Sequence, residues 1–271
     1  MTLFQAIILG IVQGITEFLP ISSSGHLVLV PNLLGWKIPP DQAFSYNVLL
    51  QAATLLAVFS FFYKDFLNLA RASFESVKQK RLVNHDAKLA LYILLTTIPA
   101  GLVGIALNGL LRKVFSQPVA SAFFLIVTAF LLILAEKLGD RTKSLEDINW
   151  LDSLWIGIFQ IFALLPGISR SGITITGGMF RDLDRTSSAS FSFLISFPLL
   201  IAAGIDGLYS FIKLPNTTES LFIFLVGSII SAIVGFLSIK WLLRFLSHRK
   251  LYTFSVYCIL FAILNIYIII R

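Results

Sequence analysis

Six apolar runs of about twenty residues constrain this chain more than any other feature; they lie near residues 42–63, 87–108, 116–137, 187–212, 219–243 and 251–270. A helix of roughly 20 apolar residues can cross the ~30 Å hydrocarbon core of a bilayer. Only 13% of the residues are charged, too few for the surface of a soluble domain. Backbone polar groups in lipid must bond to one another, and the alternating pattern of a membrane barrel is absent from the sequence. We therefore expect an all-α polytopic membrane protein.

Two further apolar units are interrupted, residues 2–35 at Pro20–Gly25 and residues 150–180 at Pro166–Gly172. The segments "GIVQGITEFLPISSSG" (10–25) and "GIFQIFALLPGISRSG" (157–172) align at a constant offset of 147, with seven identities in sixteen positions. The prolines are one place out of register. The identities are Gly10/Gly157, Ile11/Ile158, Gln13/Gln160, Ile21/Ile168, Ser22/Ser169, Ser24/Ser171 and Gly25/Gly172.

This alignment predicts a duplicated chain, with repeats at 1–149 and 150–271 in one integrated membrane domain. Each repeat holds a broken unit followed by three of the long apolar runs. If each broken unit enters and leaves the bilayer on the same side, three crossings separate the two units, and the second is upside down. The prediction is an inverted-topology repeat, each half a re-entrant helix hairpin plus three transmembrane helices. In such folds, sites form near the midplane where broken helices meet.

Most of the basic residues behind the net charge of +7 lie in the predicted loops. With the C-terminus outside, segments 64–88, 137–149, 181–185 and 240–250 are cytoplasmic loops that hold 15 of the 21 basic residues. Basic residues concentrate in the cytoplasmic loops of membrane proteins. The positive charge therefore indicates orientation, and no nucleic-acid partner is expected. Asp206, near the outer end of an apolar run, has no assigned role.

The aligned segments around the two breaks each carry one prominent charge, Glu17 in "QGITEFLPISSSG" and Arg170 in "LLPGISRSGIT". A lone charge within a membrane segment costs on the order of 2.5–3.5 kcal/mol even on the gentler insertion scale. Each side chain should therefore face a partner or a water-filled cavity. One alternative is that the two charges neutralise each other as a purely structural pair.

In both breaks a proline ends one helix, and serine and glycine residues open the next. A helix N-terminus presents unpaired N–H groups and a partial positive charge that attract phosphate. Two inverted breaks would bring two such N-termini together beside Arg170, whose guanidinium can bind phosphate bidentately. The alternative for each serine is helix capping alone.

Glu17 lies four residues after Gln13, on the same helix face, and could reach His26 if the chain reverses at the break. A glutamate beside a histidine forms a general acid/base pair, which could activate a serine nucleophile. Alternatively, the carboxylate could hold a divalent cation that bridges phosphate oxygens. A lone histidine in a membrane helix can also be a buried hydrogen-bonding group without a catalytic role.

The segments "QGITEFLPISSSGH" and "PGISRSGIT" resemble the two signature regions of the bacterial undecaprenyl-diphosphatase family, also called bacitracin-resistance proteins. The resemblance extends over the whole chain in length, layout of spans and duplication. It implies hydrolysis of undecaprenyl diphosphate to undecaprenyl phosphate and inorganic phosphate at the outer face of the bacterial cytoplasmic membrane. This reaction recycles the lipid carrier for peptidoglycan synthesis and confers bacitracin resistance, because bacitracin sequesters the diphosphate.

The resemblance implies that Glu17 and His26 are catalytic, that Ser23 is a nucleophile or phosphate ligand, and that Arg170 clamps the phosphate. It also implies a divalent cation, Mg²⁺ or Ca²⁺, with Glu17 as its ligand. The family often has an acid near "FSYN", where this chain has Asn47, which weakens a site built from several carboxylates. A homodimer is among the oligomeric states that the sequence leaves open. The expected substrate-binding residues are Gln13, Ser22, Ser24, Gly25, Ser169, Ser171 and Thr174.

Three other interpretations each fit part of the sequence. Type-2 phosphatidic-acid phosphatases share "SSGH" and "SR", but they need a histidine six residues after the second-motif arginine, where this chain has Thr176. A lipid-phosphate or anion transporter would suit an inverted repeat with discontinuous helices. A structural membrane protein would use the polar breaks only to kink its helices. Phosphate release from a prenyl diphosphate separates the enzyme from the last two.

Overall fold

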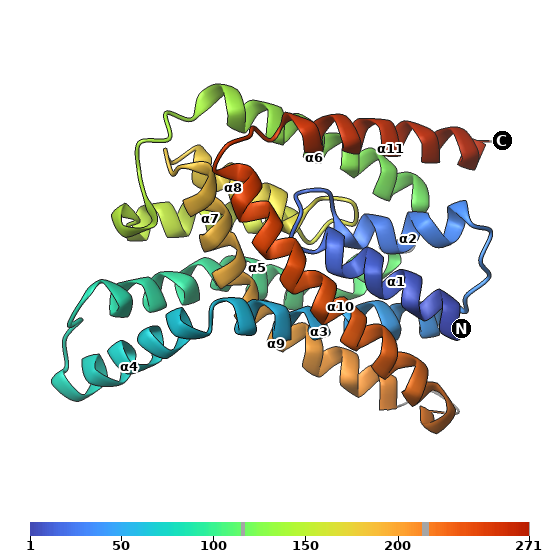
Figure 1. Ribbon diagram of the computed structural model, residues 1–271, viewed down its shortest axis with the longest axis horizontal. Coiled ribbons are helices and arrows are strands. Elements are labelled where there is room, and N and C mark those ends of the chain that lie inside the picture. The colour runs from blue at the N-terminus through green and yellow to red at the C-terminus, as the bar shows by residue number, and fades with distance from the viewer. Residues whose placement is uncertain (115–116, 213–216, 271) are drawn as a thin grey trace.

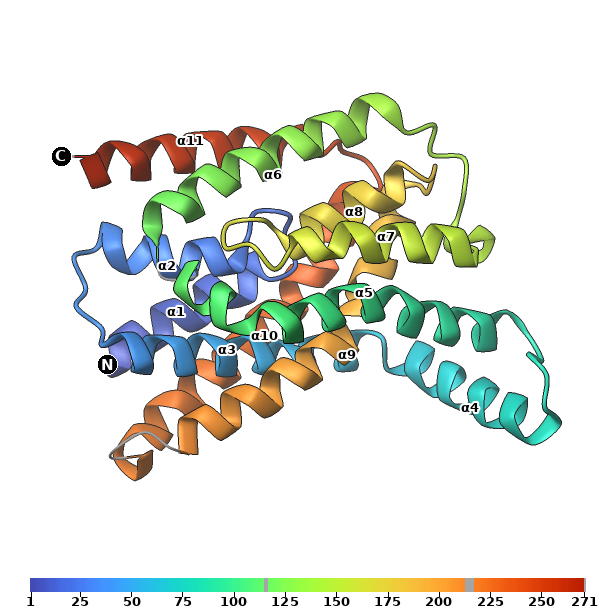
Figure 2. The same ribbon diagram turned by 180° about the vertical axis from the view of Figure 1, so that it is seen from behind.

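A computed structural model describes residues 1–114, 117–212 and 217–270, and its organised elements are helices (Figures 1 and 2). The side chains of residues 40–41, 108, 110–114, 203, 210–212 and 217–220, and that of Asp206, lie outside the described part. The elements are α1 (Leu3–Thr16), α2 (Ser23–Leu33), α3 (Pro40–Phe61), α4 (Tyr63–Gln79), α5 (His85–Val114), α6 (Pro118–Leu138), the short 3₁₀ helix η1 (Leu145–Asp147), α7 (Trp150–Phe162), α8 (Arg170–Met179), α9 (Arg185–Ile212), α10 (Thr217–Leu246) and α11 (Tyr252–Ile270).

Six helices in the described ranges are long and apolar enough to cross a membrane, which confirms the expected number. A polytopic membrane protein has this composition, and α1 and α7 are the shorter apolar helices of the two broken units. The six candidate spans are Gln42–Phe61, His85–Leu107, Pro118–Leu138, Arg185–Tyr209, Leu221–Leu246 and Tyr252–Ile270.

Both chain breaks begin and end earlier than the sequence predicted. The first separates α1 from α2 at residues 17–22, because the Ser22 side chain accepts a hydrogen bond from Gly25 N and caps α2. The second separates α7 from α8 at residues 163–169, where Ser169 accepts from Gly172 N in the same way. A serine cap lets the helix begin at the next residue. Ser23 and Arg170 are therefore the first residues of α2 and α8.

The two hairpins, α1–α2 and α7–α8, enter from opposite ends of the molecule and meet near its centre (Figures 1 and 2). Their contact is close. A Cβ atom added to Gly25 would lie 3.3 Å from Gly167 Cα. Gly167 has a φ of 95°, and a Cβ atom there would lie 2.2 Å from the carbonyl oxygen of Ser121. Gly167 is therefore a position that only glycine can occupy without displacing its neighbours.

The long helices pack around these hairpins and against one another. Helix α1 packs on α10, and α7 packs on α5; α3 packs on α9, and α6 on α11. Small residues allow the first two contacts. A Cβ atom on Gly10 would lie 2.6 Å from Gly227 O, and one on Gly157 would lie 2.7 Å from Thr96 O. The hairpins are thus held from outside by helices that touch them backbone to backbone.

Residues 64–88 were wrongly interpreted as a loop, because α4 occupies most of this segment. A single residue, Phe62, separates α3 from α4, and α4 ends at Gln79, followed by the C-cap Lys80, whose φ is 54°. The helix packs mainly on α5 through one face that includes buried Leu69, Ala72 and Ser76. Two of these three residues are small or polar, so the face is weakly apolar in sequence.

Two buried carboxylates join the helix ends at the side of the molecule where α6 ends and α7 begins. Glu136 pairs with Arg185 at 2.6 Å and accepts from Leu251 N at 2.8 Å. Asp152 pairs with Arg181 at 2.7 Å and with Lys143 at 3.4 Å. Each carboxylate is fully buried and compensated by cations. These pairs fix α6, α7, α9 and the start of α11 relative to one another.

Candidate functional site

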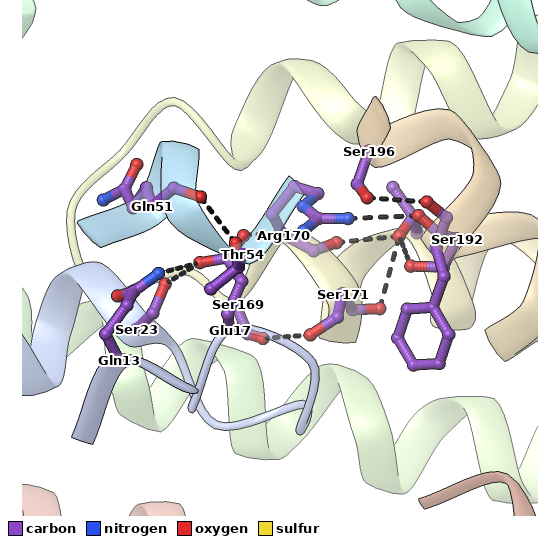
Figure 3. A network of polar contacts seen from close by, with 12 residues as sticks. Gln13, Glu17, Ser23, Gln51, Thr54, Ser169, Arg170, Ser171, Ser192 and Ser196 are labelled. Atoms are coloured by element: carbon purple, nitrogen blue, oxygen red, sulfur yellow. Dashed lines mark hydrogen bonds and ion pairs between the residues drawn. The ribbon is translucent and has the colours of Figure 1, made fainter. Parts of the chain in front are cut away.

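Glu17 and Arg170, the two charges of the broken units, form a direct ion pair where the hairpins meet (Figure 3). Arg170 Nη2 donates to Glu17 Oε1 at 2.7 Å. The side chains are 7% and 16% exposed, respectively. The sequence predicted that each charge faces a partner or a cavity, and each is the other's partner. The pair is largely shielded from solvent, and charge–charge interactions are stronger in such a place than at a water-covered surface.

The second oxygen of Glu17 accepts two hydrogen bonds. Gln13 Nε2 donates to Glu17 Oε2 at 2.8 Å from one helical turn away. Ser23 Oγ donates to the same oxygen at 2.7 Å from the start of α2. Because the Gln13 nitrogen serves the carboxylate, the amide oxygen points elsewhere, and it is buried without a hydrogen-bond partner among the described residues.

Arg170 is also held by α9. Its Nη1 donates to the Ser192 carbonyl oxygen at 3.0 Å. The hydroxyl of Thr174 donates to the Arg170 carbonyl oxygen at 2.8 Å and lies 2.7 Å from Ser192 Oγ. Ser192 is a site residue that the sequence reasoning missed. The signal was the i, i+4 spacing of Ser188, Ser192 and Ser196, which are all buried in α9.

The remaining serines join the breaks to each other. Ser171 Oγ donates to the Leu19 carbonyl oxygen at 3.0 Å, and Gly167 N donates to Ser24 Oγ at 3.5 Å. Both bonds cross from one hairpin to the other. Ser22 and Ser169 cap their helices, as the structural alternative for these serines predicted. Their hydroxyls also lie near those of Ser24, at 3.4 Å, and Ser171, at 3.1 Å.

His26 lies on α2 and binds a different set of partners from Glu17. Its Nδ1 lies 2.7 Å from the Ser22 carbonyl oxygen, and its Nε2 lies 2.8 Å from Tyr257 Oη on α11. Its ring stacks on Phe261, with centroids 4.4 Å apart. A carbonyl oxygen can only accept, so Nδ1 carries a proton, and in the neutral ring Nε2 accepts from the tyrosine hydroxyl.

Glu17 and His26 are both described by the structure and share no hydrogen bond, so the direct contact considered from the sequence is not formed. The physical reason is the early start of α2, which places His26 one turn after Ser22 and turns its ring onto that carbonyl. Tyr257, which holds the other ring nitrogen, was not singled out from the sequence. It is 231 residues away along the chain, and local sequence carries no signal of the contact.

The donor atoms beside Glu17 fit a hard cation only in part. No group of three or more His, Cys, Asp or Glu side chains that could hold a metal occurs in the described ranges. The Oε1 atom of Gln13 is buried and has no hydrogen-bond partner among the described residues, while the Nε2 atom of the same side chain donates to Glu17. Oxygen atoms are the ligands that Mg²⁺ and Ca²⁺ prefer. Mg²⁺ commonly binds through one or two carboxylates together with substrate phosphates, and Glu17 supplies one such carboxylate.

Comparison with known proteins gives one consistent result. Residues 6–264 match the family model described as "Bacitracin resistance protein BacA". The chain is 37% identical to a Myxococcus xanthus protein named undecaprenyl-diphosphatase, over 97% of this chain and 88% of that one. It is 41% identical to a namesake from Thermodesulfovibrio yellowstonii, over 94% and 93%. A third, from Chlorobaculum tepidum, is 40% identical over 97% and 95%. With its two interrupted hairpins joined by Glu17 and Arg170, this chain belongs to the bacitracin resistance protein BacA family.

Proposed function

We propose that this protein hydrolyses undecaprenyl diphosphate to undecaprenyl phosphate and inorganic phosphate. The observation that carries the proposal is the Glu17–Arg170 pair, set among serine hydroxyls at the junction of two helix N-termini. The relatives are named for this activity, and the family is named for bacitracin resistance. The reaction would return the lipid carrier to peptidoglycan synthesis.

Arg170 binds the terminal phosphoryl group in this proposal. Its guanidinium already makes two hydrogen bonds in different directions, to Glu17 and to the Ser192 carbonyl. Phosphate oxygens compete well for such a group because charge-assisted, bidentate bonds to arginine are strong. The N-termini of α8 and α2 add positive potential at the junction of the two breaks.

Glu17 accepts the proton of the nucleophile. The Ser23 hydroxyl already donates to its carboxylate, so Ser23 could attack the terminal phosphorus while its proton passes to Glu17. The bridging P–O bond then breaks, undecaprenyl phosphate leaves, and water hydrolyses the phosphoserine. In the alternative route, Ser23 holds a water molecule that attacks directly and releases phosphate in one step. Trapping of a phosphorylated serine by mass spectrometry separates the two routes.

His26 supplies or accepts a proton at Nε2, and Tyr257 is its positioning residue. The bond from Nδ1 to the Ser22 carbonyl fixes the tautomer in which Nε2 is unprotonated. Tyr257 then contacts the only remaining polar atom of the ring. This geometry resembles the support that other histidine acid/base groups receive from a second residue.

A divalent cation, where one is bound, would neutralise phosphate charge and polarise the phosphoryl oxygen. Glu17 is the residue that would hold it. Gln13 keeps Glu17 oriented through its amide nitrogen, whether or not a cation is present.

The inverted repeat is part of the proposal. The packing of the helices supports it. A symmetry operation that relates the repeats exchanges α1 with α7, α3 with α9, α5 with α10, and α6 with α11, and it converts the α1–α10 pair into the α7–α5 pair. The same exchange leaves the α3–α9 and α6–α11 pairs unchanged. In this arrangement the chain lies in the bacterial cytoplasmic membrane with its site open to the outer side. A homodimer stays a prediction.

The test is release of inorganic phosphate from undecaprenyl diphosphate by the purified full-length protein in detergent. We expect turnover by the wild-type protein and strongly reduced turnover by a folded Glu17→Gln variant. Undecaprenyl monophosphate serves as a control substrate, because it lacks the anhydride bond. A transporter would release no phosphate, and that result would overturn the proposal.

A further inference from the structure

Helix α4 carries a second apolar face that the other described helices leave largely uncovered. Tyr63, Leu67, Phe74 and Val77 are all exposed, and Phe74 and Val77 are 73% and 80% exposed. Their spacing of four, seven and three residues places them on one side of the helix. The face packed on α5, which includes Leu69, is about a third of a turn or more away. This face, the α4 apolar stripe, therefore needs a covering partner.

A line of cations runs beside the α4 apolar stripe. Lys64, Arg71 and Lys78 are spaced by seven residues, so they share one edge of the helix. All three are exposed. Residues 63–82 contain five basic residues and only two acidic ones, Asp65 and Glu75. A helix with an apolar stripe and a basic edge is typical of a segment that lies in a membrane interface.

The ends of α4 are fixed near a membrane boundary. The candidate span in α3 ends at Phe61, two residues before α4 begins, and the span in α5 begins at His85, six residues after α4 ends. We propose that α4 is an interfacial helix that binds an anionic lipid surface. The α4 apolar stripe inserts among the parts of the acyl chains next to the headgroups, and Lys64, Arg71 and Lys78 lie beside lipid phosphates.

The charge pattern favours lipid over a second copy of this chain as the partner. Two copies that buried their stripes face to face would bring their cation lines close together, and like charges in contact repel. An anionic bilayer instead complements the line, and each basic residue near such a surface strengthens binding about fivefold.

The experiment uses nitroxide spin labels on the full-length protein in vesicles. Phe74→Cys places a label on the stripe, and Asn68→Cys places a matched label on the exposed polar face without changing the charge. Cys258 is the sole native cysteine and is buried, so the wild-type protein is the labelling blank. We expect the label at 74 to be more accessible to oxygen than to a nickel chelate, and the label at 68 to show the reverse, in phosphatidylcholine vesicles that contain phosphatidylglycerol.

A charge variant tests the anionic component. Lys64→Gln, Arg71→Gln and Lys78→Gln together should increase nickel accessibility at position 74 severalfold, as should vesicles of phosphatidylcholine alone. Removing three exposed cations near the end of α10, with Arg244→Gln, Arg249→Gln and Lys250→Gln, should leave it unchanged.

Equal accessibility at 74 and 68 would overturn the proposal. Spin–spin broadening at 74 that grows with protein density would assign the stripe to a second copy and also overturn it. Protection that ignores both lipid charge and the triple variant would overturn the anionic preference.

Discussion

The two breaks share a scaffold and differ in their chemistry. Ser22 and Ser169 each cap a helix by accepting from the glycine N–H three residues later, at 3.2 and 3.0 Å. Gln13 and Gln160, which also align, each bury a side-chain oxygen without a hydrogen-bond partner among the described residues. The shared positions therefore build the interrupted helices in the same way.

The positions that differ carry the charges and the imidazole. At the offset of 147, Glu17 aligns with Leu164, Ser23 aligns with Arg170, and His26 aligns with Ile173. Each break thus supplies what the other lacks, a carboxylate and a histidine from one and a guanidinium from the other. A duplicated scaffold becomes a polar site only after its two copies diverge at these positions. This comparison separates residues that should affect stability alone from residues that should affect turnover.

The largest effect is expected at the diverged pair. Arg170→Gln should lower kcat/KM on the order of 10³-fold, the scale seen when a group that stabilises transition-state charge is lost. It should also lower stability by about 3–5 kcal/mol, because Glu17 is left as an unpaired buried charge. Phosphate release and thermal unfolding in detergent measure the two effects.

The double variant Glu17→Gln/Arg170→Gln distinguishes catalysis from structural pairing. It removes both charges, so much of the lost stability should return while turnover stays low. Recovery of turnover together with stability would show that the pair is only structural.

The next effect concerns the shared packing. Gly10→Ala and Gly157→Ala should each destabilise the fold by about 1–3 kcal/mol, because a new methyl group meets a backbone oxygen across the helix contact. Gly101→Ala is the control, since a Cβ atom there meets nothing within 4 Å. The unfolding midpoint of each variant measures the effect. A loss at only one of the two sites would mean that the aligned contacts are not energetically equivalent.

A smaller effect is expected at Tyr257. Tyr257→Phe keeps the ring beside Phe261 but removes the hydroxyl at His26 Nε2, so kcat should fall about tenfold, which corresponds to one hydrogen bond. The ¹⁵N spectrum of labelled histidine should change at Nε2, and Tyr252→Phe on the same helix should change neither quantity. An altered spectrum with unchanged kcat would leave Tyr257 as the partner of His26 and remove His26 from the mechanism. An unchanged spectrum would contradict the positioning role.

The smallest effects belong to the caps. Ser22→Ala and Ser169→Ala should each reduce stability by about 1 kcal/mol, the usual cost of losing a serine N-cap. Similar losses in chemical or thermal unfolding would support a common role. A much larger loss of turnover for one of them, at equal stability, would show that this serine also contacts the reacting group.

The long apolar helices were predictable because a bilayer imposes a length and a composition that can be counted along the chain. The breaks were predictable for a related reason, since proline, glycine and serine interrupt helices locally. Their ends were misplaced because Ser22 and Ser169 start new helices sooner than the glycines suggest. Helix α4 was missed because small and polar residues such as Ala72 and Ser76 fill its packed face.

Long-range partners were the least predictable part of the site. Opposite charges at 17 and 170 indicated their own pairing, because an isolated charge in this setting is costly. Nothing comparable indicated that His26 would turn toward Tyr257 and away from Glu17. The choice depends on where α11 passes α2, which is a property of the assembled helices.

The carboxylate of Glu17 is a built-in competitor for every anion that approaches Arg170. A ligand gains only the difference between its own attraction to the guanidinium and that of the resident carboxylate, so weakly charged anions gain little. After cleavage, the same carboxylate can reclaim its partner as each product departs. A site organised in this way exchanges affinity for rapid turnover, and it would favour the doubly phosphorylated headgroup over the singly phosphorylated one that remains.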